Sequence, residues 1–108
     1  MNIQFTDNSK EVSEDIKAAL LRGLETCGLV AEGYAKKLAP VDTGNLRNSI
    51  THTVDEEEPA AYIGTNVEYA PYQELGTIHM KAQPFLKPAV ADHANEYRKI
   101  IEKELKNG

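Results

Sequence analysis

The sequence predicts an α+β fold in which a long N-terminal helix and a C-terminal helix pack on a small antiparallel β-sheet. Apolar residues recur at steps of three and four from Ile16 to Leu38 and again from Leu86 to Leu105, as on the buried stripe of a helix. The runs between these two patterns alternate polar and apolar residues and are rich in β-branched side chains, which favours strands. With 108 residues, the chain has the size of one domain with one core.

The first helix is expected over residues 9–38, after a flexible start over residues 1–8. Asn8 and Glu11 have the spacing of a capping box, in which each side chain accepts a backbone N–H that the first turn leaves unpaired. Pro40 prevents the helix from continuing.

The length of this helix conflicts with the size of the chain. A helix along the whole apolar stripe is about 42 Å long, whereas a globule of this chain length is about 34 Å across. Either one of Gly23, Gly28 and Gly33 bends the helix, or its end projects and packs on a neighbouring subunit. Cys27, the sole cysteine, lies on the stripe and is expected to be a small buried apolar group.

A β-hairpin is expected over residues 45–67. Its first strand places Leu46, Ile50 and Val54 on one face. The acidic stretch 55–58 and Pro59 then form an exposed turn, and a second β-prone run follows over residues 61–67.

Two more helices complete the prediction. Pro71 suits a first helical turn and Gly76 suits a C-terminal cap, which predicts a short helix over residues 69–75. The segment 77–82 is a loop or a third strand, and periodicity does not separate the two. A C-terminal helix is expected over residues 85–106.

Charge and composition disfavour several classes of function. The chain has 12 Lys and Arg and 17 Asp and Glu, which gives a net charge of −5. This charge repels a phosphate backbone, so sequence-specific DNA binding is disfavoured. The N-terminus lacks the basic start and apolar run of a secretion signal, and no run approaches the ~18 apolar residues of a membrane span. We therefore expect a soluble protein made in the cytoplasm, without a membrane partner.

No pattern typical of catalysis or cofactor binding stands out, so no enzyme, metal or cofactor is expected. Residues 23–28 have the glycine spacing of a phosphate-binding loop but lack its Lys and Ser or Thr. His52, His79 and His93 are scattered without zinc-site spacing. No nucleophile-elbow pattern occurs, and the acidic run 55–58 is typical of a solvated turn.

The junction after the first helix has an explanation in turn chemistry. Asp42 can accept backbone N–H groups, and Gly44 permits a positive φ. Arg47 is close enough in sequence to pair with Asp42, or it reaches a carboxylate of a neighbouring chain. Local turn chemistry is favoured, and both interpretations stay open.

Four motifs in matching order carry more information than any of them alone. They are Ala-Pro-Val-Asp-Thr-Gly-x-Leu-Arg-x-Ser-Ile at 39–50, Ile-Gly-Thr-Asn-x-x-Tyr-Ala at 63–70, Glu-x-Gly-Thr at 74–77 and Met-x-Ala-Gln-Pro-Phe-Leu-x-Pro-Ala at 80–89. From about Val12 to Leu105 the chain resembles the gene-product-ten-like family of phage HK-ninety-seven, small neck and tail-completion proteins of tailed phages and prophages.

The resemblance implies a non-enzymatic virion component that is made in the bacterial host cytoplasm and assembles as a ring between head connector and tail tube. Its implied partners are further copies of itself, for example in a hexamer, and the proteins on the portal and tail-tube sides. DNA is implied only as passing cargo. The motif positions that it marks as interface candidates are Asp42, Thr43, Gly44, Leu46, Arg47, Ser49, Gly64, Thr65, Tyr69, Glu74, Gly76, Thr77, Gln83, Pro84, Phe85 and Pro88.

The alternative is a small cytoplasmic regulator or inhibitor that binds a host protein through the long helix. Ring formation separates the two hypotheses, because only the assembly protein forms a closed oligomer of its own copies.

Overall fold

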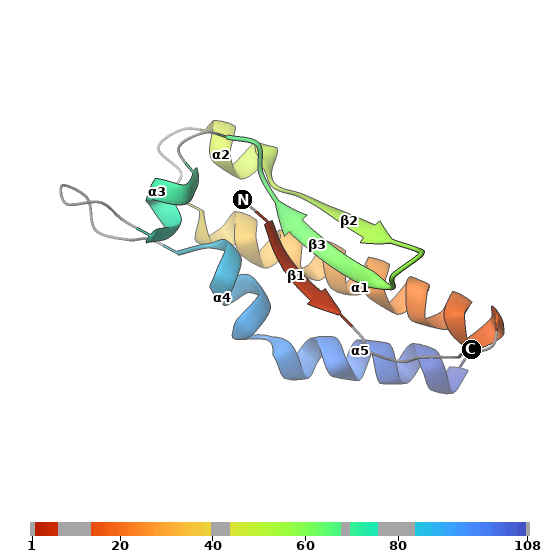
Figure 1. The fold of residues 1–108 in the computed structure, drawn as a ribbon. Helices are drawn as coiled ribbons and strands as arrows, with labels where there is room; N and C mark the ends of the chain where they lie inside the picture. The colour runs from red at the N-terminus through yellow and green to blue at the C-terminus, as the bar shows by residue number, and fades with distance from the viewer. Residues whose placement is uncertain (1, 7–13, 40–43, 68–69, 76–83, 108) are drawn as a thin grey trace.

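The computed structural model describes residues 2–6, 14–39, 44–67, 70–75 and 84–107 (Figure 1). The elements in chain order are β1 (Asn2–Thr6), α1 (Glu14–Leu38), α2 (Gly44–Ser49), β2 (Thr51–Asp55), β3 (Ala60–Gly64), α3 (Ala70–Leu75), α4 (Leu86–Ala91) and α5 (Ala94–Asn107). The predicted α+β class is confirmed, with a long N-terminal helix, an antiparallel sheet and a C-terminal helical region. The end of the first helix and the helix after Ala70 also lie as predicted.

The first residues of the chain form a strand, and the expected flexible start over 1–8 is wrong for Asn2–Thr6. β1 pairs antiparallel with β3, with Ile3 opposite Ile63 and Phe5 opposite Ala61. The alternation that marks this strand spans only five residues, and its pairing partner lies far along the sequence. The capping box predicted at 8–11 lies outside the described residues.

The segment before β2 is a helix, where the sequence analysis expected the first strand of the hairpin. α2 covers Gly44–Ser49, and only Thr51–Asp55 pair with β3. Leu46 and Ile50 are both buried, as predicted. Their spacing of four residues suits one face of a helix as well as one face of a strand, which is why the pattern did not distinguish them.

The expected C-terminal helix over 85–106 is interrupted, and α4 and α5 are separated by a turn at Asp92 and His93. The Asp92 N–H donates to the Pro88 carbonyl at 3.0 Å and closes α4. The hydroxyl of Tyr97 donates to the carbonyl of Ala89 across the turn. Because the apolar steps continue across the interruption, periodicity alone predicted one helix.

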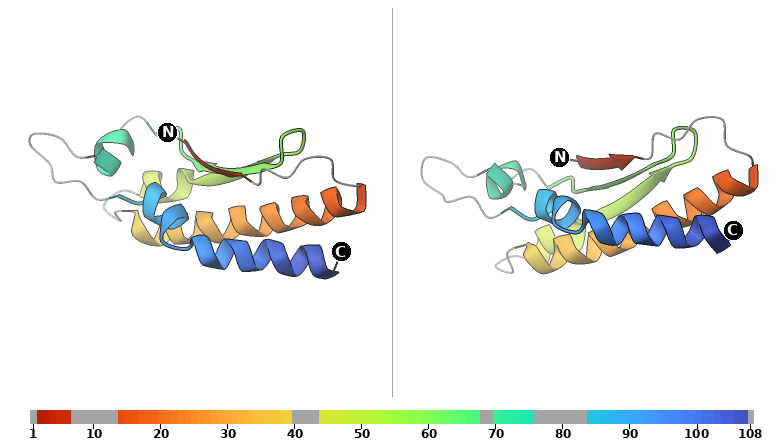
Figure 2. Two further views of the ribbon diagram at one scale, coloured as in Figure 1. Left: turned by 60° about the horizontal axis from the view of Figure 1, so that its bottom comes forward. Right: turned by 90° about the horizontal axis from the view of Figure 1, so that it is seen from below.

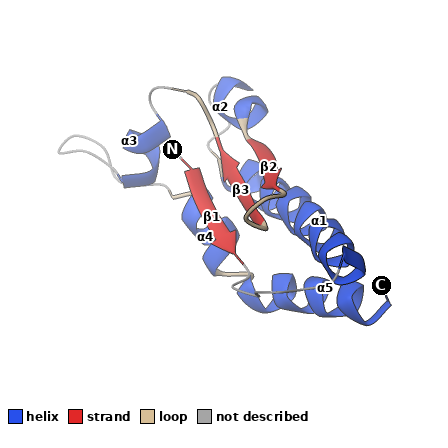
Figure 3. Ribbon diagram, turned by 45° about the vertical axis from the view of Figure 1, so that its right-hand side comes forward, coloured by secondary structure: helices blue, strands red, loops and turns tan. Residues whose placement is uncertain are grey.

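α1 packs against one face of the sheet, and α5 lies beside α1 on the same side of the sheet (Figure 2). The sheet has the order β1-β3-β2, and its neighbouring strands are antiparallel. Figure 3 shows β1 and β2 at the two edges of this sheet. α5 runs antiparallel to α1, since Cys27 meets Tyr97 while Arg22, earlier in α1, meets Glu104. None of the described helices has the length and apolar character that crossing a membrane requires.

The core is built on α1. The buried side chains of its stripe include Leu20, Leu24, Cys27, Ala31 and Ala35. They pack in two clusters with residues of β3, α2, α4 and α5. Burial, helped by the negative charge of Glu96, raises the pKa of the Cys27 thiol to about 12, so this cysteine behaves as the buried group that the sequence predicted.

The long helix is accommodated by an elongated shape. α1 has 25 residues, about 37 Å, and the molecule measures 51 × 22 × 22 Å. Its radius of gyration is 15.1 Å, whereas a globule of this chain length has about 13 Å. α1 is continuous from Glu14 to Leu38, and α5 covers one side of it, so the length conflict needs no break in the helix.

Two glycines of α1 let its neighbours approach closely. A Cβ at Gly23 would lie 3.3 Å from the Cα of Ile101 in α5, and a Cβ at Gly28 would lie 2.8 Å from Cδ2 of His52 in β2. Five residues correspond to about 140° around a helix, so the two glycines face different neighbours, α5 and β2. Gly33 has no such neighbour within 4 Å.

His52 joins β2 to α1 through two carboxylates on adjacent turns of the helix. Its Nδ1 lies 2.9 Å from Oε1 of Glu32, and its Nε2 lies 2.6 Å from Oε1 of Glu25. Carboxylates accept hydrogen bonds, so both contacts are complete only when both ring nitrogens carry a proton. Burial lowers the pKa of His52, but the hydrogen bonds and charges of Glu25 and Glu32 outweigh it and raise this pKa above 6.5.

This contact predicts a loss of stability as the pH rises. The pKa of His52 is higher in the folded than in the unfolded chain, so its stabilising contribution is complete below about 6.5 and disappears as the pH rises through the folded value. We expect a loss of about 1 kcal/mol, because Glu25 is largely exposed. Urea unfolding at pH values from about 5.5 to about 9 measures this free energy.

The matched control is His52→Gln, which keeps a polar side chain but cannot carry the charge. Its free energy of unfolding should change less with pH than that of the parent chain, since His93 and the remaining groups are common to both. Parallel curves for the two proteins would contradict the proposed contribution of His52.

Candidate functional site

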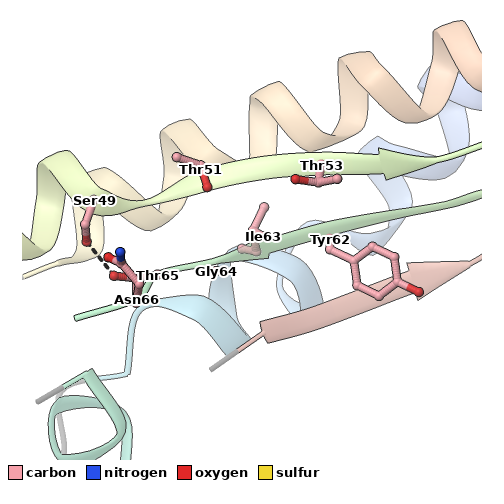
Figure 4. Close-up of a pocket in the computed structure, with 8 residues that line it drawn as sticks. All are labelled: Ser49, Thr51, Thr53, Tyr62, Ile63, Gly64, Thr65 and Asn66. Atoms are coloured by element: carbon pink, nitrogen blue, oxygen red, sulfur yellow. Dashed lines mark hydrogen bonds between the residues drawn. The ribbon is translucent and has the colours of Figure 1, made fainter. Parts of the chain in front are cut away.

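A groove opens on the face of the sheet that points away from α1 (Figure 4). His52 reaches α1, and side chains alternate along a strand, so Thr51 and Thr53 point to the opposite face. The volume of the groove is about 590 Å³. Its lining residues are Ser49, Thr51, Thr53, Tyr62, Ile63, Gly64, Thr65 and Asn66.

Most of the described side chains that line the groove carry a hydrogen-bonding group, and none of them is charged. Among the described residues, five of the lining side chains carry a hydroxyl group, one carries an amide, and none is Asp, Glu, Lys or Arg. Thr51 and Thr53 are exposed. Hydroxyl and amide groups both donate and accept hydrogen bonds, so the groove can bond to donors and acceptors of another protein surface.

One end of the groove is fixed by a hydrogen bond between Ser49 of α2 and Thr65 after β3. The Ser49 hydroxyl also lies 2.8 Å from the Leu46 carbonyl, and Thr65 Oγ1 accepts the Val67 N–H at 3.1 Å. These contacts join the end of α2 to the end of β3. Two motif residues that the sequence marked as interface candidates thus position the rim of the groove.

Arg47 differs from the other two arginines of the chain in its hydrogen bonding. Arg22 pairs with Glu104 at 3.3 Å and Arg98 donates to Asn95 at 2.6 Å. Nε of Arg47 is buried and has no hydrogen-bond partner among the residues that the structure describes. Asp42, the local partner considered from the sequence, lies outside those residues.

Glu74 has a structural role inside the chain. Its side chain is almost fully buried, with 4% of the residue exposed. Oε1 accepts the N–H groups of Phe85 at 3.2 Å and Leu86 at 2.8 Å, and Oε2 accepts that of Lys87 at 3.3 Å. These N–H groups have no partner within the first turn of α4, and the helix dipole favours a negative charge there. Glu74 therefore joins α3 to the start of α4.

The remaining motif residues divide between the core and the undescribed segments. Leu46 and Phe85 are core residues, Gly44 begins α2, Gly64 ends β3, Pro84 is exposed before α4, and Pro88 occupies the first turn of α4. The motif residues outside the described part of the chain are Asp42, Thr43, Tyr69, Gly76, Thr77 and Gln83.

A cluster that the sequence analysis missed joins α1 to the start of α5. The Tyr34 hydroxyl donates to Oε1 of Glu96 at 2.6 Å, and its ring stacks on His93 with centroids 3.6 Å apart. The hydrogen bond to Glu96 raises the pKa of Tyr34, and burial raises that of Tyr97. Tyr34 and Tyr97 lie on the predicted apolar stripes, which gave no sign of their polar partners.

The geometry offers no reaction centre within the described residues. The Cys27 thiol is buried, and its raised pKa keeps it protonated at neutral pH. No three or more His, Cys, Asp and Glu side chains in this part of the chain are grouped to hold a metal ion. The groove offers hydrogen-bonding groups for another polar surface.

Comparison with known proteins gives one match. Residues 3–76 match a protein-family model described as "Bacteriophage HK97-gp10, putative tail-component". The matched region runs from β1 to just beyond α3 and includes the groove, Arg47 and Glu74. It covers more than two thirds of the chain and ends before the motif at 80–89. No curated protein and no solved structure matches the chain.

The position of Glu74 predicts a specific loss of stability. Glu74→Gln leaves one acceptor oxygen and no charge, so the N–H groups at the start of α4 lose part of their bonding, and we expect a cost of about 1–3 kcal/mol. Urea unfolding measures this cost, and amide hydrogen exchange locates it at Phe85–Lys87. Glu102→Gln on the exposed side of α5 is the control. Equal stability of the two variants would contradict the role assigned to Glu74.

Proposed function

Because the family model covers more than two thirds of it, the chain belongs to the HK97-gp10-like family of bacteriophage tail components, and we propose that it is a head–tail joining or tail completion protein that forms a ring at the neck. Membership of this family makes it a structural protein of the phage particle and implies no enzymatic activity. The family assignment also disfavours the alternative of a host-protein regulator.

The observation that carries the ring proposal is the uncovered outer face of the sheet. Among the described residues, α1 covers one face, and the opposite face presents the groove. Ser49, Gly64 and Thr65, which belong to the family motifs, lie at this groove. A subunit that is repeated around a ring has one surface for each neighbour, and an open, hydrogen-bonding face supplies one of them.

The charge of the chain fits a ring through which DNA passes. The net charge of −5 disfavours strong binding to phosphate groups, so DNA is cargo rather than a ligand. The partners that we propose are further copies, for example in a hexamer, with the connector on the portal side and the tail tube on the other. Assembly takes place in the cytoplasm of the bacterial host, and the mature location is the virion.

Electron microscopy of the purified protein tests the ring directly. At high concentration, alone or with the connector or tail proteins of the same phage, we expect closed rings with a central opening. A regulator of a host protein would instead give complexes of fixed low stoichiometry without rings. Persistent absence of rings, including in the presence of both virion partners, would overturn the proposed assembly.

Deletion of the gene tests whether the protein acts at the neck of the particle. Without this protein we expect heads and tails that accumulate separately, with plaque formation lost by several orders of magnitude and restored by the gene in trans. A structural protein acts through its presence in the particle, so the recovery of plaque formation should rise with the amount of intact protein supplied in trans. Joined, infectious particles without the chain would contradict a neck function.

A further inference from the structure

We propose that copies of the chain join through their backbones, with the outer edge of β2 in one copy pairing in parallel with the outer edge of β1 in the next. The sheets of successive copies then form one continuous sheet. This inference rests on the proposed ring and adds the contact that joins its subunits.

Both edges of the sheet lack a strand partner among the described residues. The order β1-β3-β2 leaves one side of β1 and one side of β2 unpaired, at opposite edges of the sheet (Figure 3). In the same part of the chain, the backbone hydrogen bonds outside the helices and strands involve neither β1 nor β2. An edge strand presents a row of unpaired N–H and C=O groups, which another strand can bond to.

Neither strand has the features that commonly protect an edge from pairing. Asn2–Thr6 and Thr51–Asp55 contain no Pro and no Lys. Both strands pair with β3 residue by residue over their whole length, so no bulge bends them. Asp55 stands at the end of β2, where it accepts N–H groups of the following turn. Native proteins blunt exposed edges with such features, and their absence indicates edges that pair with a neighbour.

The two edges match each other in length and position. β1 and β2 have five residues each, and they pair with the same five residues of β3. Asn2 and Thr51, the first residues of the two strands, both lie opposite Gly64. Both strands are antiparallel to β3 and therefore run parallel to each other. When a second copy continues the sheet, its β1 lies along the whole of β2 with the ends aligned.

The backbone groups of the two edges alternate as a parallel pair requires. In an antiparallel pair, the N–H and C=O of one residue point to the same neighbouring strand. A residue of β3 therefore bonds to one edge strand, while the residue opposite it in the other edge strand directs its groups outward. The side changes at each residue of β3, so the outward groups of β1 and β2 are offset by one residue. The slanted bonds of a parallel pair join groups with this offset.

A second copy is the partner that these observations favour. Pairing of β2 with β2 of another copy would end at two copies and leave both β1 edges unpaired. Pairing of β2 with β1 joins two different edges, so it repeats from copy to copy and closes into a ring when the rotation permits. A closed sheet has no edge left to pair. Thr51 and Thr53 belong to β2 and line the groove, so the added strand would lie beside the groove.

Disulfide trapping in the full-length protein tests the contact. Gln4 and Thr53 both lie opposite Tyr62, so within one copy β3 separates them by about 10 Å, which is too far for a disulfide. Between copies that pair as proposed, the same positions are about 5 Å apart. We expect Gln4→Cys/Thr53→Cys to give a ladder of three or more linked copies under mild oxidation, in the concentrated protein or in phage particles that contain it. Cys27 is buried.

Matched variants identify which strands pair and in which direction. Asn2→Cys/Thr51→Cys should give the same ladder, because an antiparallel pairing of β1 with β2 would place these two positions at opposite ends. Thr53→Cys alone should give few dimers, whereas β2–β2 pairing centred on this residue would link most copies as dimers. Thr53→Cys/Glu102→Cys, with Glu102 exposed on α5, is the control and should give no ladder.

Three results would overturn the contact. The first is the absence of both ladders from the concentrated protein and from particles. The second is a ladder from Gln4→Cys/Thr53→Cys without one from Asn2→Cys/Thr51→Cys. The third is efficient dimer formation by Thr53→Cys alone.

Charge placement gives a second readout that needs no oxidation. Gln4→Lys/Thr53→Lys sets like charges opposite each other across the contact, and we expect self-association in sedimentation velocity to weaken about fivefold. Gln4→Glu/Thr53→Lys sets opposite charges there and should associate at least as strongly as the parent chain. Urea unfolding of both variants separates association from stability, and Asn2 with Thr51 accepts the same exchange should a variant at Gln4 fail to fold. Equal association of the two variants would contradict the pairing.

The two proposals fail in distinguishable ways. Rings in the microscope without either ladder would refute the contact and leave the neck function standing. A ladder from a protein that is absent from joined particles would support the contact and refute the neck function.

Discussion

The close approach of the sheet and of α5 to α1 is the constraint on which the rest of the fold depends. Gly28 makes room for His52 and β2, and Gly23 makes room for Ile101 and α5. Because these glycines point about 140° apart, one helix can carry a sheet on one side and a second helix on another. Each glycine in a helix costs about 1 kcal/mol, and this cost is offset by the packing of Ile101 beside Gly23 and by the bonds of His52 to Glu25 and Glu32 beside Gly28.

The sequence predicted the elements whose signals are local. The apolar stripe and Pro40 predicted where α1 ends, and the acidic stretch with Pro59 predicted the turn between β2 and β3. β1 was missed because its stability comes from pairing with β3, a contact between distant parts of the chain. The helix α2 and the interruption after α4 were missed because a spacing of three or four residues does not reveal where one element gives way to another.

The sequence predicted some residues of the candidate site, but it did not predict how they are arranged in space. The family resemblance selected Ser49, Gly64 and Thr65, and the structure brings them together at the groove although they belong to two separate motifs. Thr51 and Thr53 carried no signal beyond that of ordinary strand residues. Glu74 was marked as an interface candidate, yet its carboxylate is directed at the backbone of its own chain, which only the folded geometry reveals.

These observations describe a subunit whose motifs maintain its shape while one face of its sheet remains open to a neighbour. The central claim is that this chain is a component of one ring in the phage particle. Quantitative mass spectrometry of purified virions, with the portal protein as internal reference, tests it most directly. The account predicts a constant copy number per particle, comparable with that of the portal. Particles that lack the chain, or that contain it in the large excess typical of a tube protein, would contradict it.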